Sequence, residues 1–383
     1  MQRRIPELDG LRAIAVTMVV LWHYVGIPAG NDSWLFLFFR LGRSGVDLFF
    51  VLSGFLITSI LIESRRRSDY YASFYLRRAL RILPLYAVML LIYYAARWHG
   101  GGPDELFGGS FPDWTYVLFL QNFVSGFSGN YGPMWLAATW SLAVEEQFYL
   151  LFPLVVAFVP FSQLPRVLVL TILATALVRI VAAKTGGHAA AYVLMPCRAD
   201  TLAIGALIAW AMKDDQARQW LLTNAQKVRR CCGAMIALTC LLWLIPTAGY
   251  YSHMANWGYS LLALLYGTIL LAVLVSVGRP RLHILRTRAA AGIAEISYAL
   301  YLVHAPALAG VFSFAHLPKT LNNGTAILLV VAALLLSVAL SVLSLFLIER
   351  PARRLGDARF TPRGKPVGHP GSVASRQSSV SPH

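Results

Sequence analysis

The hydrophobic positions of the chain gather in long runs that short polar segments separate. Ten of these runs approach the ~20 residues that a helix needs to cross the hydrocarbon of a bilayer. The predicted spans are 11–28, 45–63, 81–97, 140–160, 166–183, 192–212, 231–249, 257–277, 296–315 and 324–348. So many runs of this length do not fit a soluble core. The pattern therefore predicts an all-α integral membrane protein, a bundle of about ten transmembrane helices.

The positions of the charges predict the orientation of that bundle. Only 13% of the 383 residues are charged, the net charge is +16, and basic residues cluster at 3–4, 65–81, 213–230, 278–288 and from 350 onward. Lys and Arg in short loops mark the cytoplasmic side. Ten crossings with cytoplasmic N- and C-termini place every basic cluster inside. An eleventh crossing at the short run 114–123 would invert the later loops, so we predict that this segment is re-entrant or interfacial.

Composition also divides the chain into two regions. Residues 1–350 form the predicted transmembrane domain, and residues 351–383 form a predicted disordered basic cytoplasmic tail, because their Pro, Gly, Ser and Arg leave too little apolar surface to fold. The first span is retained, since His23 interrupts its apolar stretch and no small-residue cleavage site follows. We attribute the basic charge to topology and to anionic membrane lipids, and we expect no nucleic-acid partner. The four cysteines lack metal-ligand spacing, so no metal site is predicted.

The first span carries two polar residues at membrane depth. Arg12 and His23 are eleven residues apart, which returns them to within ~20° of one helix face and separates them by ~16 Å along the axis. Ionisable residues inside a membrane often mark a functional path. The alternative is that Arg12 extends to the lipid phosphates and that His23 is a hydrogen-bonded packing residue.

Two arginines enter the third span from the cytoplasm. In YLRRALRILP, Arg78 and Arg81 lie three apart on one helix face, while Arg77 points elsewhere. Such a pair can bind phosphates, although it also fits a positive-inside anchor.

A pair of acids lies one turn inside the fourth span. In WSLAVEEQFYLLFP, Ser141, Glu145 and Tyr149 share a face at four-residue spacing, which makes Glu145 rather than Glu146 the preferred candidate. A carboxylate there can orient an imidazole, act as a base or pair with a buried arginine.

Two further polar groups occur later in the chain. Ser297, Tyr301 and His304 follow at four- and three-residue spacing, and Arg198 and Asp200 open the sixth span. Both groups fit the lining of a shared cavity, with a structural Arg198–Asp200 pair favoured for the second. The candidate lining residues are Asp9, Ser141, Glu146, Tyr149, Tyr301 and His304.

Five strings of the chain resemble the acyltransferase 3 family of integral-membrane O-acyltransferases. They are LDGLRAIAV with His23, GVDLFFVLSGFLIT, RRALRILP, WSLAVEEQFYLLFP and SYALYLVH. They follow the family's order between residue 7 and about residue 350. One departure is visible, because many members carry a histidine just before the WSL motif, whereas this chain reads AATWSL.

The resemblance implies an enzyme that moves an acyl group, usually acetyl, from coenzyme A to a sugar hydroxyl. It implies donor binding by Arg12, Arg78 and Arg81, and catalysis by His23 and Glu145. We expect His23 to remove the acceptor proton, with Glu145 holding the ring's tautomer or balancing the imidazolium. A covalent acyl-histidine relay is the alternative chemistry.

The resemblance also implies the partners and the location. No cofactor is permanently bound, and acetyl-CoA serves as the donor. The acceptor is a carbohydrate, free or lipid-linked, in a polysaccharide, a lipopolysaccharide or a glycoside, and the location is the bacterial inner membrane. Two other classes remain open, a transporter or flippase, which predicts discontinuous helices in two related halves, and a sensor that has lost the chemistry.

Overall fold

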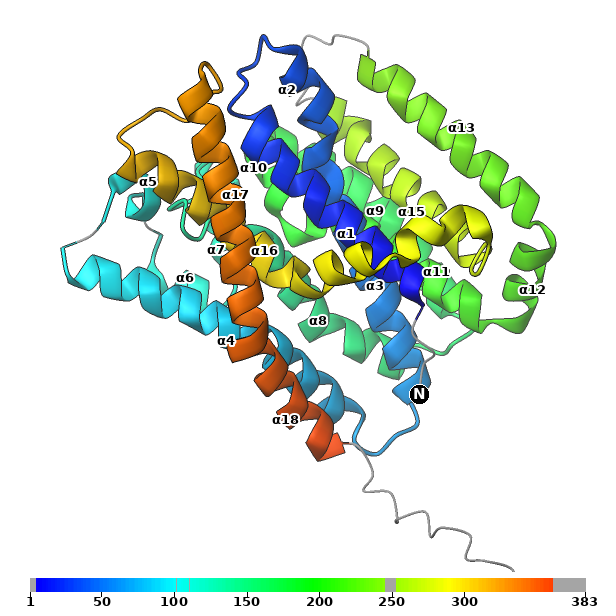
Figure 1. Cartoon of the computed structure of the whole chain (residues 1–383). Helices are drawn as coiled ribbons and strands as arrows, with labels where there is room; N and C mark the ends of the chain where they lie inside the picture. The colour runs from blue at the N-terminus through cyan, green and yellow to red at the C-terminus, as the bar shows by residue number, and fades with distance from the viewer. Residues whose placement is uncertain (1–4, 101, 110, 245–252, 361–383) are drawn as a thin grey trace, which may run out of the picture.

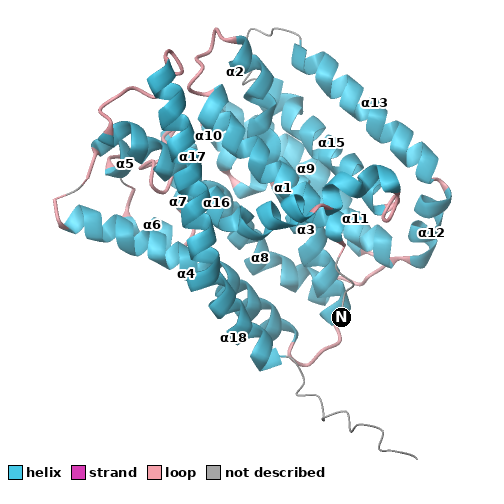
Figure 2. Cartoon of the chain, in the orientation of Figure 1, coloured by secondary structure: helices cyan, strands magenta, loops and turns pink. Residues whose placement is uncertain are grey.

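The computed structural model describes residues 5–100, 102–109, 111–244 and 253–360, and every regular element in these ranges is helical (Figures 1 and 2). The all-α prediction is confirmed for this part of the chain. The helices are α1 (Pro6–Leu21), α2 (Trp34–Phe39), α3 (Gly45–Ser64), α4 (Tyr70–Trp98), α5 (Asp104–Phe107), α6 (Asp113–Val117), α7 (Gln121–Ser128), α8 (Thr139–Phe158), α9 (Leu164–Thr185), α10 (Gly187–Val193), α11 (Ala199–Lys213), α12 (Asp215–Thr223), α13 (Ala225–Leu244), α15 (Tyr259–Leu274), α16 (Arg288–Phe314), α17 (Gly324–Ser344) and α18 (Arg350–Phe360).

Eight helical stretches of the described chain are long and apolar enough to cross a membrane. They contain α1, α3, α4, α8, α9, α15, α16 and α17, and they identify a multi-pass membrane protein. The predicted span 192–212 corresponds mainly to α11, whose 15 residues cover about 22 Å. The predicted span 231–249 corresponds to α13 as far as Leu244, and its residues 245–249 lie outside the described residues. The first turns of α13 carry Lys227, Arg229 and Arg230. The count of ten therefore stays a prediction.

The segment 114–123 does not form one helix. It lies in α6 and the start of α7, and the connection between them contains Phe119 at a φ of 55°. Neither helix has the length to cross a bilayer, since α6 has five residues and α7 has eight.

The predicted disordered tail, residues 351–383, includes part of a helix. Residues 351–360 belong to α18, which packs against α4, as the lower part of Figure 1 shows. The packing is close, because a Cβ on Gly356 would lie 3.2 Å from Leu80 Cδ1. The prediction of disorder is therefore wrong for 351–360, and residues 361–383 lie outside the described residues.

Helix α3 crosses α11 with almost no space between the two backbones. A Cβ on Gly54 of α3 would lie 2.0 Å from the Leu202 carbonyl oxygen, and one on Gly205 of α11 would lie 2.0 Å from the Val51 carbonyl oxygen. Small residues allow this close approach of membrane helices, where van der Waals packing contributes much of the association energy. The two helices form the most extensive helix pair of the bundle.

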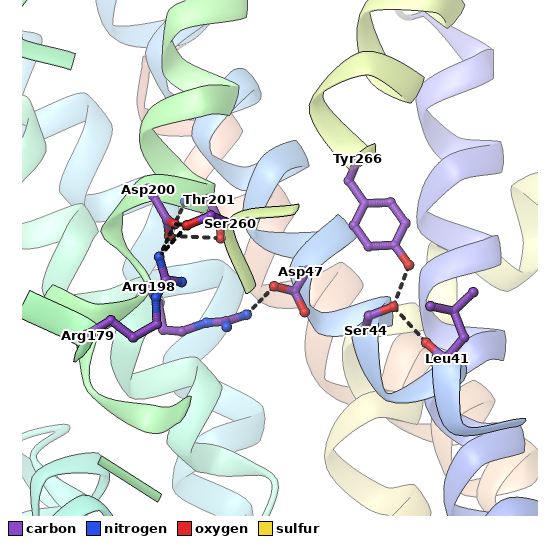
Figure 3. Close-up of polar contacts among 9 residues, drawn as sticks. All are labelled: Leu41, Ser44, Asp47, Arg179, Arg198, Asp200, Thr201, Ser260 and Tyr266. Carbon is purple, nitrogen blue, oxygen red and sulfur yellow. Dashed lines mark hydrogen bonds and ion pairs between the residues drawn. The ribbon is translucent and has the colours of Figure 1, made fainter. Parts of the chain in front are cut away.

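Two buried ion pairs join the helices around that crossing (Figure 3). Arg198, just before α11, pairs with Asp47 of α3, and Arg179 of α9 donates to Asp200 of α11 at 2.5 Å. All four side chains are at most 1% exposed. Ser260 of α15 also donates to Asp200, at 3.2 Å. Arg198 and Asp200 thus have the structural role that the sequence predicted. The predicted pairing of the two with each other is wrong, because Arg198 pairs with α3 and Asp200 pairs with α9.

The Arg198 guanidinium is also enclosed by aromatic rings. Its Cζ lies 4.7 Å from the ring centroid of Tyr259, 5.5 Å from that of Tyr192 and 5.7 Å from that of Phe50. Cation–π contacts of this kind stabilise a charge that has been removed from water. Arg198 therefore ties α3, α10 and α15 to the start of α11.

We predict that Asp47→Ala lowers the free energy of unfolding by about 3–5 kcal/mol, because it leaves the Arg198 charge buried without its carboxylate. Thermal unfolding of the purified protein in detergent measures the effect. The control is Glu63→Ala at the half-exposed Lys213–Glu63 pair, which we expect to cost at most about 1 kcal/mol. Equal losses in the two variants would contradict the structural role of the buried pair.

Candidate active site

Five helices enclose a cavity of about 100 Å³ that contains most of the predicted polar residues. Its polar lining comes from α1, α3, α4, α8 and α16: Arg12, Ser53, Arg78, Arg81, Ser141, Glu145, Tyr149, Ser297, Tyr298 and Tyr301. Four segments far apart in the sequence, which were singled out separately, therefore converge on one space.

A wider chamber of about 440 Å³, which we call the vestibule, adjoins this cavity. The two spaces share Arg12, Leu56, Arg81, Ser297 and Tyr298, so they lie side by side. The vestibule lies at the start of α1 and reaches α18 through Arg353. Asp9 lines it, as the sequence predicted for a polar cavity.

Three arginines line the inner cavity, and two of them, Arg12 and Arg81, also line the vestibule. Arg12 comes from α1, and Arg78 and Arg81 come from successive turns of α4. Arg12 lies 3.7 Å from Asp9, and the Arg78 guanidinium lies 5.3 Å from the centroid of the Tyr149 ring. Since Glu145 is the one carboxylate of the described residues that line the inner cavity, that cavity has an excess of positive charge.

The carboxylate of Glu145 is bound by a serine that the sequence reasoning missed. Ser53 Oγ donates to Glu145 Oε1 at 2.5 Å, and Tyr149 OH donates to the same Ser53 Oγ at 3.0 Å. Ser53 lies in the string GVDLFFVLSGFLIT, where a hydroxyl in the middle of an apolar span is the signal that could have identified it.

Glu146 has a different position from its neighbour. Of the described residues, those lining the cavity and the vestibule do not include it. Its Oε1 is buried without a hydrogen-bond partner in the described structure. The predicted lining role of Glu146 is therefore wrong for these two chambers.

Tyr301 forms the end of the cavity opposite the vestibule. Its hydroxyl lies 2.6 Å from Ser141 Oγ, and its ring packs edge-on against Phe49 with centroids 6.0 Å apart. One turn earlier on α16, Tyr298 donates to the Ile82 carbonyl at 2.7 Å and so ties α16 to α4. The space for a ligand therefore ends at the Tyr301 and Phe49 rings.

Beyond Tyr301 lie two histidines in direct contact. The His23 and His304 ring centroids are 4.9 Å apart in an edge-on arrangement, and the His304 and Tyr301 centroids are 5.7 Å apart. His23 is partly exposed, whereas His304 is 1% exposed. Neither histidine lines the cavity itself, so the Tyr301 ring separates the imidazole pair from the three arginines.

The tautomer of His23 follows from the local backbone. His23 lies in a π-helical turn, Trp22–Gly26, directly after α1, and its ring lies against the Val19 carbonyl of α1, four residues back. His23 Nδ1 lies 2.8 Å from that carbonyl oxygen. Because a carbonyl only accepts, Nδ1 carries the proton and Nε2 carries the lone pair.

This geometry corrects one predicted interaction. Glu145 was expected either to hold the His23 tautomer or to balance its imidazolium. The Val19 carbonyl bonds to Nδ1 and fixes the tautomer, and Glu145 binds Ser53. The physical reason is that Val19, four residues before His23, lies within hydrogen-bond reach of the ring, which removes the need for a second helix. Arg12 lines the cavity, whereas His23 contacts His304, so the two residues contact different parts of the site.

The fold and the cavity thus define a multi-pass membrane protein with an internal arginine-lined chamber. The chain belongs to the acyltransferase 3 family, whose acyltransferase-domain model matches residues 5–345.

Among its relatives are two bacterial enzymes. The peptidoglycan O-acetyltransferase OatA of Listeria monocytogenes (strain EGD-e) is 28% identical over 396 residues, which cover 97% of this chain and 61% of that protein. The O-acetyltransferase OatA of Staphylococcus aureus (strain NCTC 8325) is 28% identical over 386 residues, which cover 94% of this chain and 58% of that protein. The chain therefore spans about three-fifths of the length of these relatives. No solved structure matches it.

We predict that Ser53→Ala lowers the free energy of unfolding by about 1–3 kcal/mol, because it leaves the buried Glu145 carboxylate without its hydroxyl donor. Thermal unfolding in detergent measures the change. Ser64→Ala at the other end of α3 is the matched control, since Ser64 donates to the carbonyl of Ile60 in its own helix. A loss in Ser53→Ala no larger than the control's would show that the bond to Glu145 contributes nothing.

Proposed function

We propose that the protein is a membrane O-acyltransferase that moves an acetyl group from cytosolic acetyl-CoA to a hydroxyl of a cell-surface sugar. The observation that carries the proposal is the arrangement of the vestibule, the cavity lined by Arg12, Arg78 and Arg81, and the imidazole pair, which contacts the cavity-lining Tyr301. A charged donor that stays on one side of a membrane and reacts near the other side suits an arrangement of this kind.

The three arginines bind the phosphates of the donor. Guanidinium groups pair with phosphate through charge-assisted hydrogen bonds, and these bonds strengthen where water is excluded. The excess of arginine over carboxylate in the inner cavity supports this role. Arg12 thereby contacts the donor rather than the lipid headgroups, because it lines both chambers.

The pantetheine arm extends from the arginines toward Tyr301. Most of the remaining cavity wall is apolar, with Val46, Phe49, Phe50 and Leu142 on it, and suits an acyl chain. For the thioester to reach His23, the Tyr301 ring has to turn aside. The Ser141–Tyr301 hydrogen bond is therefore the contact that opens during the reaction.

His23 acts as the general base. With Nδ1 bound to Val19, its Nε2 accepts the proton of the attacking hydroxyl while the new C–O bond forms at the thioester carbonyl. The C–S bond then breaks, and the imidazolium returns the proton to the departing thiolate. Glu145 is a charge partner for the donor-binding arginines, since it lies with them in the cavity. In the acyl-histidine relay, Nε2 itself would carry the acetyl group.

The acceptor is a glycan of the cell surface. The relatives' names, peptidoglycan O-acetyltransferase among them, support a peptidoglycan-type sugar over a lipopolysaccharide or a small glycoside. The bacterial origin of these relatives also supports the bacterial inner membrane as the location. Ten spans with both termini in the cytoplasm place the vestibule on the side where acetyl-CoA is made.

A glycan transporter is the competing function. Transporters bind their cargo near the midplane, commonly between two related halves. The enzyme is favoured because the chain belongs to an acyltransferase family and because three arginines against one carboxylate in the inner cavity suit a donor that carries phosphates.

We predict that Arg81→Ala raises the KM for acetyl-CoA by about tenfold to a hundredfold, the contribution of one hydrogen bond to a charged group. Acetyl transfer from radiolabelled acetyl-CoA in membranes measures it. Arg77→Ala removes the same charge from an exposed position on the same helix and should leave the KM unchanged. Equal effects of the two variants would mean that the net charge of α4, and not a specific phosphate contact, sets donor affinity.

We predict that His23→Ala lowers kcat by about 100-fold to 10,000-fold, which is the usual contribution of a general base. The same assay measures kcat, and the KM for acetyl-CoA should change little because His23 lies beyond the cavity. His316→Ala removes an exposed histidine from the segment after α16 and serves as the control. Activity close to that of the unmodified protein in His23→Ala would exclude both the base and the acyl-histidine roles.

A further inference from the structure

His304 carries a buried lone pair that the mechanism above leaves unused. Its Nδ1 lies 2.7 Å from the Tyr301 carbonyl oxygen, so Nδ1 is the protonated nitrogen and Nε2 is an acceptor. Among the described residues, no donor reaches Nε2, although that atom is closed off from solvent. The free energy cost of such an atom is about 1–3 kcal/mol.

The hydroxyl groups around His304 are already bonded elsewhere. Tyr24 OH donates to the His304 carbonyl at 2.8 Å and lies 2.7 Å from Ser337 Oγ. The Tyr301 hydroxyl and Ser141 Oγ bond to each other. The surrounding polar groups thus fix the His304 backbone and the Nδ1 side of its ring, and they leave Nε2 open.

The His304 ring contacts a second imidazole, that of His23. Both rings donate from Nδ1 to a carbonyl of their own helix and carry the lone pair on Nε2, and their centroids are 4.9 Å apart. A packing role alone does not account for this pair, because an apolar side chain would fill the same space without an unsatisfied atom. Two neighbouring hydrogen-bond acceptor atoms in a reaction site suit a substrate that carries two neighbouring O–H or N–H groups.

We propose that His304 is a substrate-contacting residue of the acceptor site, whose Nε2 accepts a hydrogen bond from a second O–H or N–H group of the acceptor sugar. This inference rests on the proposed function. While His23 Nε2 takes the proton of the reacting hydroxyl, His304 Nε2 binds the neighbouring group and so selects which hydroxyl is presented. The acceptor class is a sugar with a hydroxyl or amide N–H next to the acylated position. The acceptor sugar approaches from the side of His23, whose ring is partly exposed and contacts the His304 ring.

Acceptor analogues test this assignment. The probes are the methyl glycosides of N-acetylglucosamine and N-acetylmuramic acid, each with a set of analogues in which one hydroxyl or the N–H is replaced. Acetyl transfer by the purified full chain in proteoliposomes gives kcat/KM for each probe. In the unmodified protein, loss of the donor next to the acylated position should lower kcat/KM about tenfold, the value of one neutral hydrogen bond.

Two substitutions of His304 separate binding from packing. In His304→Leu, the parent sugar and the analogue lacking that donor should react equally, because the acceptor atom is gone. In His304→Gln, part of the preference should return, because the amide oxygen can accept the same bond. A preference in His304→Leu equal to that of the unmodified protein would overturn the assignment.

Tyr24→Phe is the structural control. It removes the hydroxyl that holds the His304 backbone and leaves Nε2 in place, so it should lower the thermal stability but keep the tenfold preference. Loss of the preference in Tyr24→Phe to the same degree as in His304→Leu would indicate a general distortion and overturn the inference. If the unmodified protein transfers acetyl to no acceptor, the proposed function fails as a whole. If all variants still transfer acetyl and prefer the parent sugar over the analogue to the same degree, the role of His304 is rejected and the proposed function stands.

Discussion

The need to satisfy charge inside a membrane governs this structure more than any other constraint. Asp47, Arg179, Arg198 and Asp200 are at most 1% exposed, and each carries a charge that lipid does not solvate. Their pairing is possible only when α3, α9 and the start of α11 are packed in one arrangement. That arrangement also places Ser53, two turns along α3 from Asp47, against Glu145 of α8. The buried pairs thus position one wall of the cavity without contacting a ligand.

The arginines of the cavity differ from the structural arginines in one respect. Arg179 and Arg198 each have a buried carboxylate in direct contact. Arg78 and Arg81 form no salt bridge with the carboxylates that line the two described chambers, Glu145 in the cavity and Asp9, Glu295 and Glu349 in the vestibule. A cation at membrane depth without a carboxylate in direct contact is costly unless a ligand or water supplies the balance. The difference separates the arginines that hold the bundle together from those available to an anionic donor.

The sequence predicted the helical class and most of the cavity residues, because both depend on short-range patterns. Polar side chains at three- and four-residue spacing identified the correct faces of α1, α4, α8 and α16. The partners across helices could not be predicted in the same way. Arg198 and Asp200 are two residues apart in sequence but pair with α3 and α9, and Glu145 binds Ser53 rather than His23. Such pairs depend on how helices that are far apart in the chain pack together. The spacing of residues within one helix contains no information about this packing.

Local patterns also failed where the backbone departs from the α-helix. The π-helical turn at Trp22–Gly26 contains His23, whose ring bonds to the Val19 carbonyl of α1, and the sequence of the turn does not distinguish it from the rest of the span. The helix at 350–360 was missed because its composition is polar, and its order comes from contact with α4. In both cases tertiary structure outweighs local propensity.

The glycine crossing of α3 and α11 determines which side of the chamber is able to move. With Gly54 and Gly205 each placed against a carbonyl oxygen of the other helix, neither helix can slide or rotate past its partner without a backbone collision. On the opposite side, α4 is joined to α16 at Tyr298 and to α8 at Tyr70 and Tyr75 by single hydrogen bonds from tyrosine hydroxyls. A tyrosine side chain can follow a tilting helix, whereas two interlocked backbones cannot. The α3–α11 side of the chamber is therefore held by direct backbone contact, whereas α4 is held against α8 and α16 by side-chain hydrogen bonds.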